Sequence, residues 1–369
     1  MIFSTGLFYF RQHQMIEKNN PKTIRAWAFY DWANSVYSLV ISTAIFPIFY
    51  SSQTIVPELI RDVDGEKIAY VRFFGKELIN TELYSYTLSL SFLIVAIISP
   101  ILSGIADYTG SKKKFLKFFC YLGSLSCAML FFFDINHLEI SLVFMLLASI
   151  GFWGSLVFYN AFLPEIANVE LHDEVSAKGF AYGYIGSSIL LVLILAVLMS
   201  FGYEYTKYSF IAVAIWWVGF AQVTYNGLPN NVYGRKPSQE YLWKGYQELR
   251  KVWSELTGLS NVKRFLTSFF VYSMGVQTVM VMAVLFAKKE IDWGGGGDTG
   301  LIVSVLIIQF VAVAGALMFA KLSKRIGNIP VIGIALLFWI GICLAAYFIT
   351  KPIEFYILAA VVGLVMGGI

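Results

Sequence analysis

Long apolar runs separated by short polar connections dominate this chain. Taking about 20 residues as the length of one membrane-spanning helix, we predict about ten such helices. They lie roughly at 27–50, 83–105, 115–133, 138–162, 179–201, 207–227, 265–287, 300–320, 329–349 and 353–369. Helices are expected because a segment in lipid must satisfy its own backbone hydrogen bonds. The pattern therefore predicts an all-α, polytopic membrane protein.

A polar stripe follows the first predicted helix and is centred on Asp31. A carboxylate inside a membrane helix costs a few kcal/mol or more, so it normally faces the protein interior or a wet cavity. At about 100° per residue, four further polar residues fall within roughly 60° of it. They are Asn34, Ser35, Ser38 and Ser42. We expect this helix to line a hydrated pathway.

The role of Asp31 stays open between two readings. Six residues separate it from Arg25, or about 9 Å at 1.5 Å per residue, so it lies nearer one membrane face than the midplane. A carboxylate at that depth can bind an amino group of a solute or relay a proton. It can equally hold a gate by accepting hydrogen bonds from neighbouring helices.

The composition agrees with a membrane protein and excludes several other classes. The chain is 58% apolar and 14% charged, whereas a soluble protein carries about 25% charge. The three cysteines all lie in apolar runs, which argues against a disulfide framework. The three histidines lie outside the predicted helices, so we expect no metal site and no cofactor. The net charge of +4 needs no nucleic-acid partner.

The distribution of Lys and Arg predicts the orientation in the membrane. Basic residues concentrate before the first helix and in the connections that follow even-numbered helices, chiefly 112–117 and 235–264. The long connection 51–82 carries basic residues too, but mixes them with acidic ones. Because basic loops stay on the cytoplasmic side, we expect a cytoplasmic N-terminus.

An internal repeat predicts two halves. The second and the eighth helices are each followed by a short basic turn that contains a glycine, Gly110 and Gly327. The longest cytoplasmic connection separates the first six helices from the rest, the layout of transporters built from repeats. The predicted organisation is a cytoplasmic segment (1–26), a six-helix bundle (27–227), a central loop with an amphipathic helix (228–264) and a second bundle truncated after about four spans (265–369).

The turn after the second helix resembles the major-facilitator loop motif G-x-x-x-D-x-x-G-R-K. Asp107, Gly110 and Lys112 are in place, whereas Ser103 and Ser111 stand where a glycine and a basic residue are expected. Segments 27–35, 158–165, 175–186 and 272–278 resemble the bacterial unidentified major facilitator family, which is related to the autophagy-linked vacuolar amino-acid effluxers.

This resemblance covers the chain from about residue 24 onward. It implies the major-facilitator fold, in which two pseudo-repeated six-helix bundles face each other, with the second bundle incomplete in this chain. It also implies a multi-pass protein of the bacterial inner (cytoplasmic) membrane. We expect a monomer whose partners are the lipid bilayer and a small-molecule solute.

Polar residues of three predicted helices are candidates for the solute pathway. They are Asp31, Asn34, Ser38, Ser42, Tyr159, Asn160, Ser273 and Gln277. For Asn160, an interhelical hydrogen bond is the favoured reading, with a pathway role as the alternative. Three glycines on the fifth helix, Gly179, Gly183 and Gly186, are spaced for close contact with another helix.

A second set of residues predicts a gate. Asp107, Gly110, Lys112 and Lys113 lie on one cytoplasmic turn. A carboxylate there can pair with basic groups or with a helix N-terminus of the opposing bundle while the inside is closed. The alternative is that the lysines reflect membrane topology alone.

These features favour a secondary active transporter that exports or exchanges a small polar solute by alternating access, with amino acids as the first hypothesis. No phosphate-binding loop G-x-x-x-x-G-K-[ST] occurs in the sequence, and proton coupling through Asp31 is the hypothesis for the driving force. A non-transporting sensor or a lipid flippase on the same fold is the alternative. An enzyme is not expected, because acids and histidines do not converge at one membrane depth.

Overall fold

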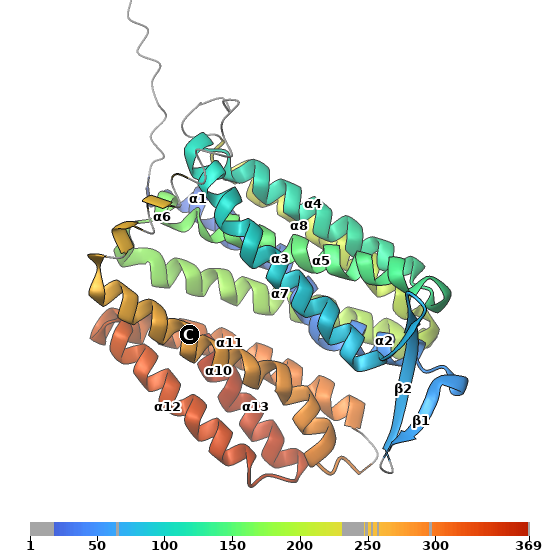
Figure 1. Cartoon of the computed structure of the whole chain (residues 1–369). Coiled ribbons are helices and arrows are strands. Elements are labelled where there is room, and N and C mark those ends of the chain that lie inside the picture. The colour runs from blue at the N-terminus through green and yellow to red at the C-terminus, as the bar shows by residue number, and fades with distance from the viewer. Residues whose placement is uncertain are drawn as a thin grey trace, which may run out of the picture.

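The structure is a computed structural model. It describes residues 18–63, 66–230, 258–294 and 297–367, together with 247, 250, 251 and 254–256. Two groups of long helices lie side by side, one formed by the first half of the chain and one by the second (Figure 1). The predicted amphipathic helix of the central loop lies largely outside the described residues.

The first group is built around one helix of 33 residues, Pro21–Gln53, which comprises α1 (Pro21–Val36), the π-helix η1 (Tyr37–Ile45) and α2 (Phe46–Gln53). α1 packs against α7 and α8, and α5 packs against α3 and α4. The other elements of this group are α3 (Asn80–Thr109), α4 (Lys112–Met129), α5 (Leu138–Asn160), α6 (Leu163–Ile166), α7 (His172–Phe201) and α8 (Thr206–Gly227).

The second group contains α10 (Ser260–Glu290), α11 (Gly297–Ile326), α12 (Asn328–Ala346) and α13 (Pro352–Met366). Within it, α11 packs closely on α13 because glycines let the backbones approach. A Cβ added at Gly315 would lie 2.2 Å from the carbonyl oxygen of Leu364. Between the two groups, α7 and α11 make the main contact.

The prediction of a polytopic membrane protein whose spans are helices is confirmed. Within the described residues, eight helices are long and apolar enough to cross a membrane, and α13 is a shorter apolar helix. The first helix begins at Pro21 rather than at residue 27. Proline suits the first helical turn, and the side chain of Asn20 caps the helix by accepting a hydrogen bond from the backbone N–H of Lys22.

The connection 51–82, which the sequence analysis treated as a loop, contains a three-stranded antiparallel sheet. Its strands are β1 (Ile60–Val63), β2 (Glu66–Phe73) and β3 (Lys76–Ile79), in the order β1-β2-β3. Val71 is fully buried against the first helix group, and the N–H of Phe74 donates to Glu139 Oε1 at 2.8 Å. The sheet is therefore anchored to the start of α5.

The two turns of the internal repeat share a backbone feature. Gly110 ends α3 with φ of +67°, and Gly327 follows α11 with φ of +86°. Residues with a side chain rarely adopt these angles, so glycine is favoured at both positions. The two glycines share a positive φ but differ in ψ, which is 24° at Gly110 and 161° at Gly327.

Candidate functional site

Asp31 lies inside the first helix group and does not face lipid. Its side chain is 7% exposed, and the hydroxyl of Tyr159 on α5 donates a hydrogen bond of 2.8 Å to Asp31 Oδ2. α7 covers the carboxyl from another side. The stripe predicted from the first helix is therefore enclosed by protein at its Asp31 end.

Glycines of α7 allow this close approach. A Cβ added at Gly179 would lie 2.5 Å from Asp31 Oδ2, and one added at Gly183 would lie 2.5 Å from the Oγ of Ser35. Gly186 is similarly close to the ring of Trp32. The expected close contact by these three glycines is confirmed, and any larger residue there would push α7 away from the polar stripe.

Aromatic packing fixes the orientation of Tyr159. The indole N–H of Trp27 donates to the Tyr159 carbonyl oxygen at 2.9 Å, and the two rings are stacked with centroids 4.4 Å apart. The ring of Tyr30 lies 5.1 Å from that of Tyr159. Because all three rings are buried, the hydroxyl that binds Asp31 is held in place.

Among the described residues, no cation is paired with the carboxyl of Asp31. An isolated carboxylate is expensive to bury, whereas the neutral acid or a carboxylate paired with a cation is not. This arrangement can hold a proton, or a cationic group of a solute once α7 moves aside.

The polar stripe becomes more open toward the middle of the helix. Asn34 is 1% exposed, and its Nδ2 has no hydrogen-bond partner in the described structure. Ser42 is half-buried and Ser38 is exposed. A buried amide N–H without a partner costs about 1–3 kcal/mol, which makes Asn34 a candidate ligand for a polar solute.

The remaining pathway candidates are not brought to Asp31. Asn160 is exposed at the last position of α5, one residue after Tyr159. On α10, Ser273 is half-buried and Gln277 is exposed. No hydrogen bond joins these three residues to α1 in the described part of the chain, so their place in the pathway stays a prediction.

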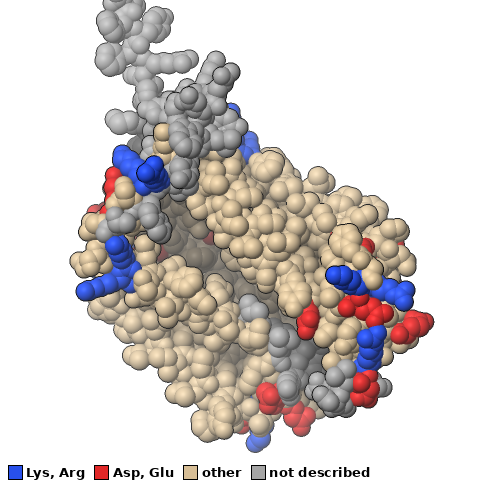
Figure 2. Space-filling view, viewed as in Figure 1, with Lys and Arg blue, Asp and Glu red and all other residues tan. Residues whose placement is uncertain are grey.

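The molecular surface agrees with a pathway between the two helix groups. Figure 2 shows a hollow that runs between them, while Lys, Arg, Asp and Glu gather toward the two ends of the molecule. The uncharged middle matches the helices that cross the membrane.

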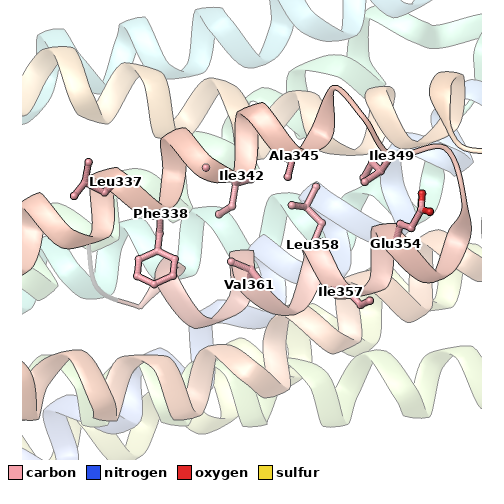
Figure 3. A pocket seen from close by; sticks show the side chains of 10 residues that line it. Leu337, Phe338, Ile342, Ala345, Ile349, Glu354, Ile357, Leu358 and Val361 are labelled. Carbon is pink, nitrogen blue, oxygen red and sulfur yellow. The ribbon is translucent and has the colours of Figure 1, made fainter.

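A separate cavity of about 540 Å³ lies between α12 and α13 (Figure 3). Its walls are apolar except for Glu354, whose carboxylate already accepts the backbone N–H groups of Thr350 and Lys351. None of the candidate pathway residues lines it. Such a cavity does not suit a polar solute.

The predicted gating residues are only partly described. Lys112 Nζ donates to Glu165 Oε1 at 2.8 Å, and Lys113 Nζ donates to the carbonyl oxygen of Leu228 at 2.8 Å. These contacts lie within the first helix group. The side chain of Asp107 is outside the described part of the structure, so its contact with the opposing bundle stays a prediction.

Polar contacts between the two groups occur instead between the start of α7 and the turn that joins the end of α11 to Asn328, the first residue of α12. Ser323 Oγ donates to Asp173 Oδ2 at 2.5 Å, and Asn328 Nδ2 lies 3.4 Å from Asp173 Oδ1. Lys324 forms an ion pair with Glu174. We call these five residues the α7–α11 clasp. Acids in the first turn of one helix and a cation in the last turn of another also suit both helix dipoles.

The sequence analysis missed the clasp because it began the fifth helix at residue 179, which left Asp173 and Glu174 in a loop. The available signal was the acidic pair placed directly before that helix, opposite in charge to the basic turn after the eighth helix.

Comparisons with known proteins extend these observations. Residues 19–369 match the family model described as vacuole effluxer Atg22 like. The chain is 31% identical over 360 residues to the uncharacterized MFS-type transporter YxiO of Bacillus subtilis, covering 95% of this chain and 79% of that protein. It is 23% identical to autophagy-related protein 22 of Coccidioides immitis, covering 95% and 75% of the two chains.

Solved structures with similar folds are major facilitator superfamily transporters. FucP in the outward conformation aligns with a TM-score of 0.60 and 14% identity, covering 93% of this chain and 81% of that one. The proton:xylose symporter XylE aligns with a TM-score of 0.57 and 13% identity, covering 94% and 78%. At such identities the comparison establishes the fold.

Proposed function

This chain belongs to the Atg22-like vacuole effluxer family and is a multi-pass membrane transporter of the major facilitator superfamily, not an enzyme; from this premise we propose that it is a secondary active transporter that exports a small polar solute by alternating access, driven by protons. Amino acids are the first class to test. We place it in the bacterial inner membrane as a monomer, with the N-terminus in the cytoplasm.

The observation that carries this proposal is the sealed carboxyl of Asp31. It has one hydrogen-bond donor, Tyr159, and no cation beside it in the described structure. A buried carboxyl without a cation favours its protonated, neutral form, whereas contact with water favours the ionised form, because hydration removes the cost of the charge. Opening and closing of the site therefore links protonation of Asp31 to the conformation of the helices.

The clasp supports alternating access. With a cytoplasmic N-terminus, the start of α7 and the end of α11 lie at the cytoplasmic side, so the clasp holds that side closed. Along the first helix, exposure increases from Asp31 to Ser38, that is, away from the cytoplasmic side. Both features fit a transporter whose cytoplasmic entrance is shut, with Asp31 cut off behind it.

The polar groups on α1 fit an amino acid in their chemistry. Asp31 can bind an ammonium group, and the free N–H of Asn34 can donate to a carboxylate. The two residues are three positions apart, or about 4.5 Å along the helix axis. A zwitterionic solute would satisfy both groups, whereas a neutral sugar would leave Asp31 without a cation.

The proposal is tested with purified protein in two steps. A thermal-shift screen against the common amino acids should identify a ligand, because a ligand at about 100 times its dissociation constant stabilises a protein by roughly 2.7 kcal/mol. The ligand is then loaded, radiolabelled, into proteoliposomes with and without an imposed pH gradient. Faster efflux with the gradient supports the proposal. Equal efflux in both, or lipid scrambling without solute movement, contradicts it.

A further inference from the structure

The π-helix in the first membrane helix is a feature that the proposed function has not used. η1 covers nine residues, Tyr37–Ile45, between two α-helical stretches. π-helical turns are rare and mostly short, and they occur frequently at functional sites. Its last described backbone bond runs from the N–H of Phe46 to the carbonyl oxygen of Ile41, five residues earlier.

The sequence explains why the helix widens here. Pro47 lies two residues after the end of η1, in the first turn of α2. A proline has no N–H to donate, and in a continuous α-helix its ring would clash with the carbonyl group four residues earlier, that of Thr43. A change of helical register before Pro47 removes this conflict.

Thr43 makes a hydrogen bond that fits the π register. Its Oγ1 donates to the carbonyl oxygen of Ser38, five residues earlier, at 2.9 Å. Two threonines inside α-helices donate four residues back instead, Thr87 to Leu83 and Thr278 to Met274. The Thr43 bond therefore belongs to the widened helix.

The register decides which face of the helix Thr43 occupies. In an α-helix, residues five apart point about 140° away from each other, which would put Thr43 well off the polar stripe. In the π-helix the backbone hydrogen bonds join residues five apart, so these residues lie on the same side of the helix, and both Ser38 and Thr43 are exposed. The π register thus adds a hydroxyl to the stripe that α-helical periodicity does not include.

The other sides of η1 are covered by protein. The ring of Tyr37 contacts Phe152 on α5 and Trp217 on α8, with centroids 5.1 and 5.7 Å apart. α7 also packs against η1. Ser38 and Thr43 occupy the side left open, continuous with Asp31 on the same helix.

We propose that Thr43 is a positioning residue of the solute pathway: its bond to the Ser38 carbonyl holds the π register, and that register presents Ser38 and Thr43 together to a small polar solute. Return of η1 to α-helix would turn Thr43 away and interrupt the stripe between Asp31 and the open side. The inference rests on the proposed transport function, which supplies the solute.

The test reads the register directly by thiol labelling. Cys343 is exposed, whereas Cys120 and Cys127 are buried, so Cys343→Ser provides the background. In proteoliposomes, a membrane-impermeant methanethiosulfonate should label Ser38→Cys and also Thr43→Cys, whose thiol can still donate a weak hydrogen bond to the Ser38 carbonyl oxygen and so keep the π register. Labelling of Ser38→Cys alone, or of neither, would overturn the proposal, because Thr43 would then lie off the stripe or the stripe would face lipid.

A second comparison isolates the hydroxyl of Thr43. In the Ser42→Cys background, Thr43→Val should speed labelling by about two- to ten-fold, the change expected for loss of one ordinary hydrogen bond, because α-helical register turns half-buried Ser42 toward the stripe in place of residue 43; Thr43→Ser should restore the original rate. Thr87→Val is the matched control, since it removes an α-type bond in α3. Equal rates for Thr43→Val and Thr87→Val would refute the inference. Labelling needs no transported solute, so failure of the transport proposal shows separately in the efflux assay.

Discussion

The α7–α11 clasp gives a prediction whose size follows from the structure. Asp173→Ala removes the acceptor of two hydrogen bonds from the second helix group, those of Ser323 and Asn328. Hydrogen bonds to a charged group contribute about 1.5–3 kcal/mol. Glu174→Ala removes an ion pair whose side chains are 43% and 62% exposed, and such pairs contribute only about 0.2–1 kcal/mol.

These magnitudes predict an order of effects on the balance between the closed and the open cytoplasmic side. Asp173→Ala should shift it toward the open state by at least about 10- to 150-fold, the loss of the Ser323 bond alone, since 1.4 kcal/mol corresponds to a factor of ten and the Asn328 contact is long at 3.4 Å. Glu174→Ala should shift it by about five-fold at most. Glu170→Ala is the matched control, because it removes the same charge near the start of α7 from an exposed side chain.

The assay is a distance measurement between spin labels at the exposed positions Lys178 on α7 and Lys321 on α11, in the Cys343→Ser background. The closed population should dominate in the starting protein and fall most in Asp173→Ala. An unchanged distance distribution in Asp173→Ala, or a larger effect of Glu170→Ala than of Asp173→Ala, would refute the reasoning.

Two further predictions concern the contacts of Asp31. Gly179→Ala should lower the thermal unfolding midpoint through an overpacking cost of about 1–3 kcal/mol, since the new Cβ would lie 2.5 Å from Asp31 Oδ2. The control is Gly275→Ala, whose Cβ meets no atom within 4 Å and which should leave the midpoint unchanged or raise it. Equal midpoints for the two variants would argue against the close packing. Tyr159→Phe leaves the Asp31 carboxyl without its donor and should lower the free energy of unfolding by about 1–3 kcal/mol, measured by denaturant titration. Tyr182→Phe is the control, because the Tyr182 hydroxyl makes no hydrogen bond in the described part of the chain. Indistinguishable unfolding curves for the two variants would contradict the observed bond.

Apolar run length predicted most of the fold. The fourth helix was expected at 138–162 and is found at Leu138–Asn160, and the sixth was expected at 207–227 and is found at Thr206–Gly227. The fifth was expected from 179 but begins at His172. Its first turn carries charged residues, which a search for apolar runs leaves out of the helix. The helix nevertheless includes them and continues beyond the apolar segment.

The site was predicted only in part, for reasons of geometry. The stripe around Asp31 followed from α-helical periodicity, and Tyr159 was named as a pathway residue, but their hydrogen bond depends on how α1 and α5 pack. Thr43 was missed because the same periodicity places it off the stripe, whereas η1 is π-helical. Strands β1 to β3 were missed because they are short and rich in charged residues. The bounds proposed for the two bundles and the central loop stay a prediction.

The most direct test of the proposed mechanism compares two modes of transport by purified Asp31→Asn in proteoliposomes. Asparagine keeps the size of the side chain, and its amide oxygen can still accept the Tyr159 hydrogen bond. It cannot take up or release a proton at physiological pH. We predict that the variant loses acceleration by a pH gradient, and that its exchange of radiolabelled ligand between the two sides needs a higher ligand concentration, because the carboxylate that binds the ammonium group is gone. Acceleration equal to that of the unmodified protein would contradict a coupling role for Asp31.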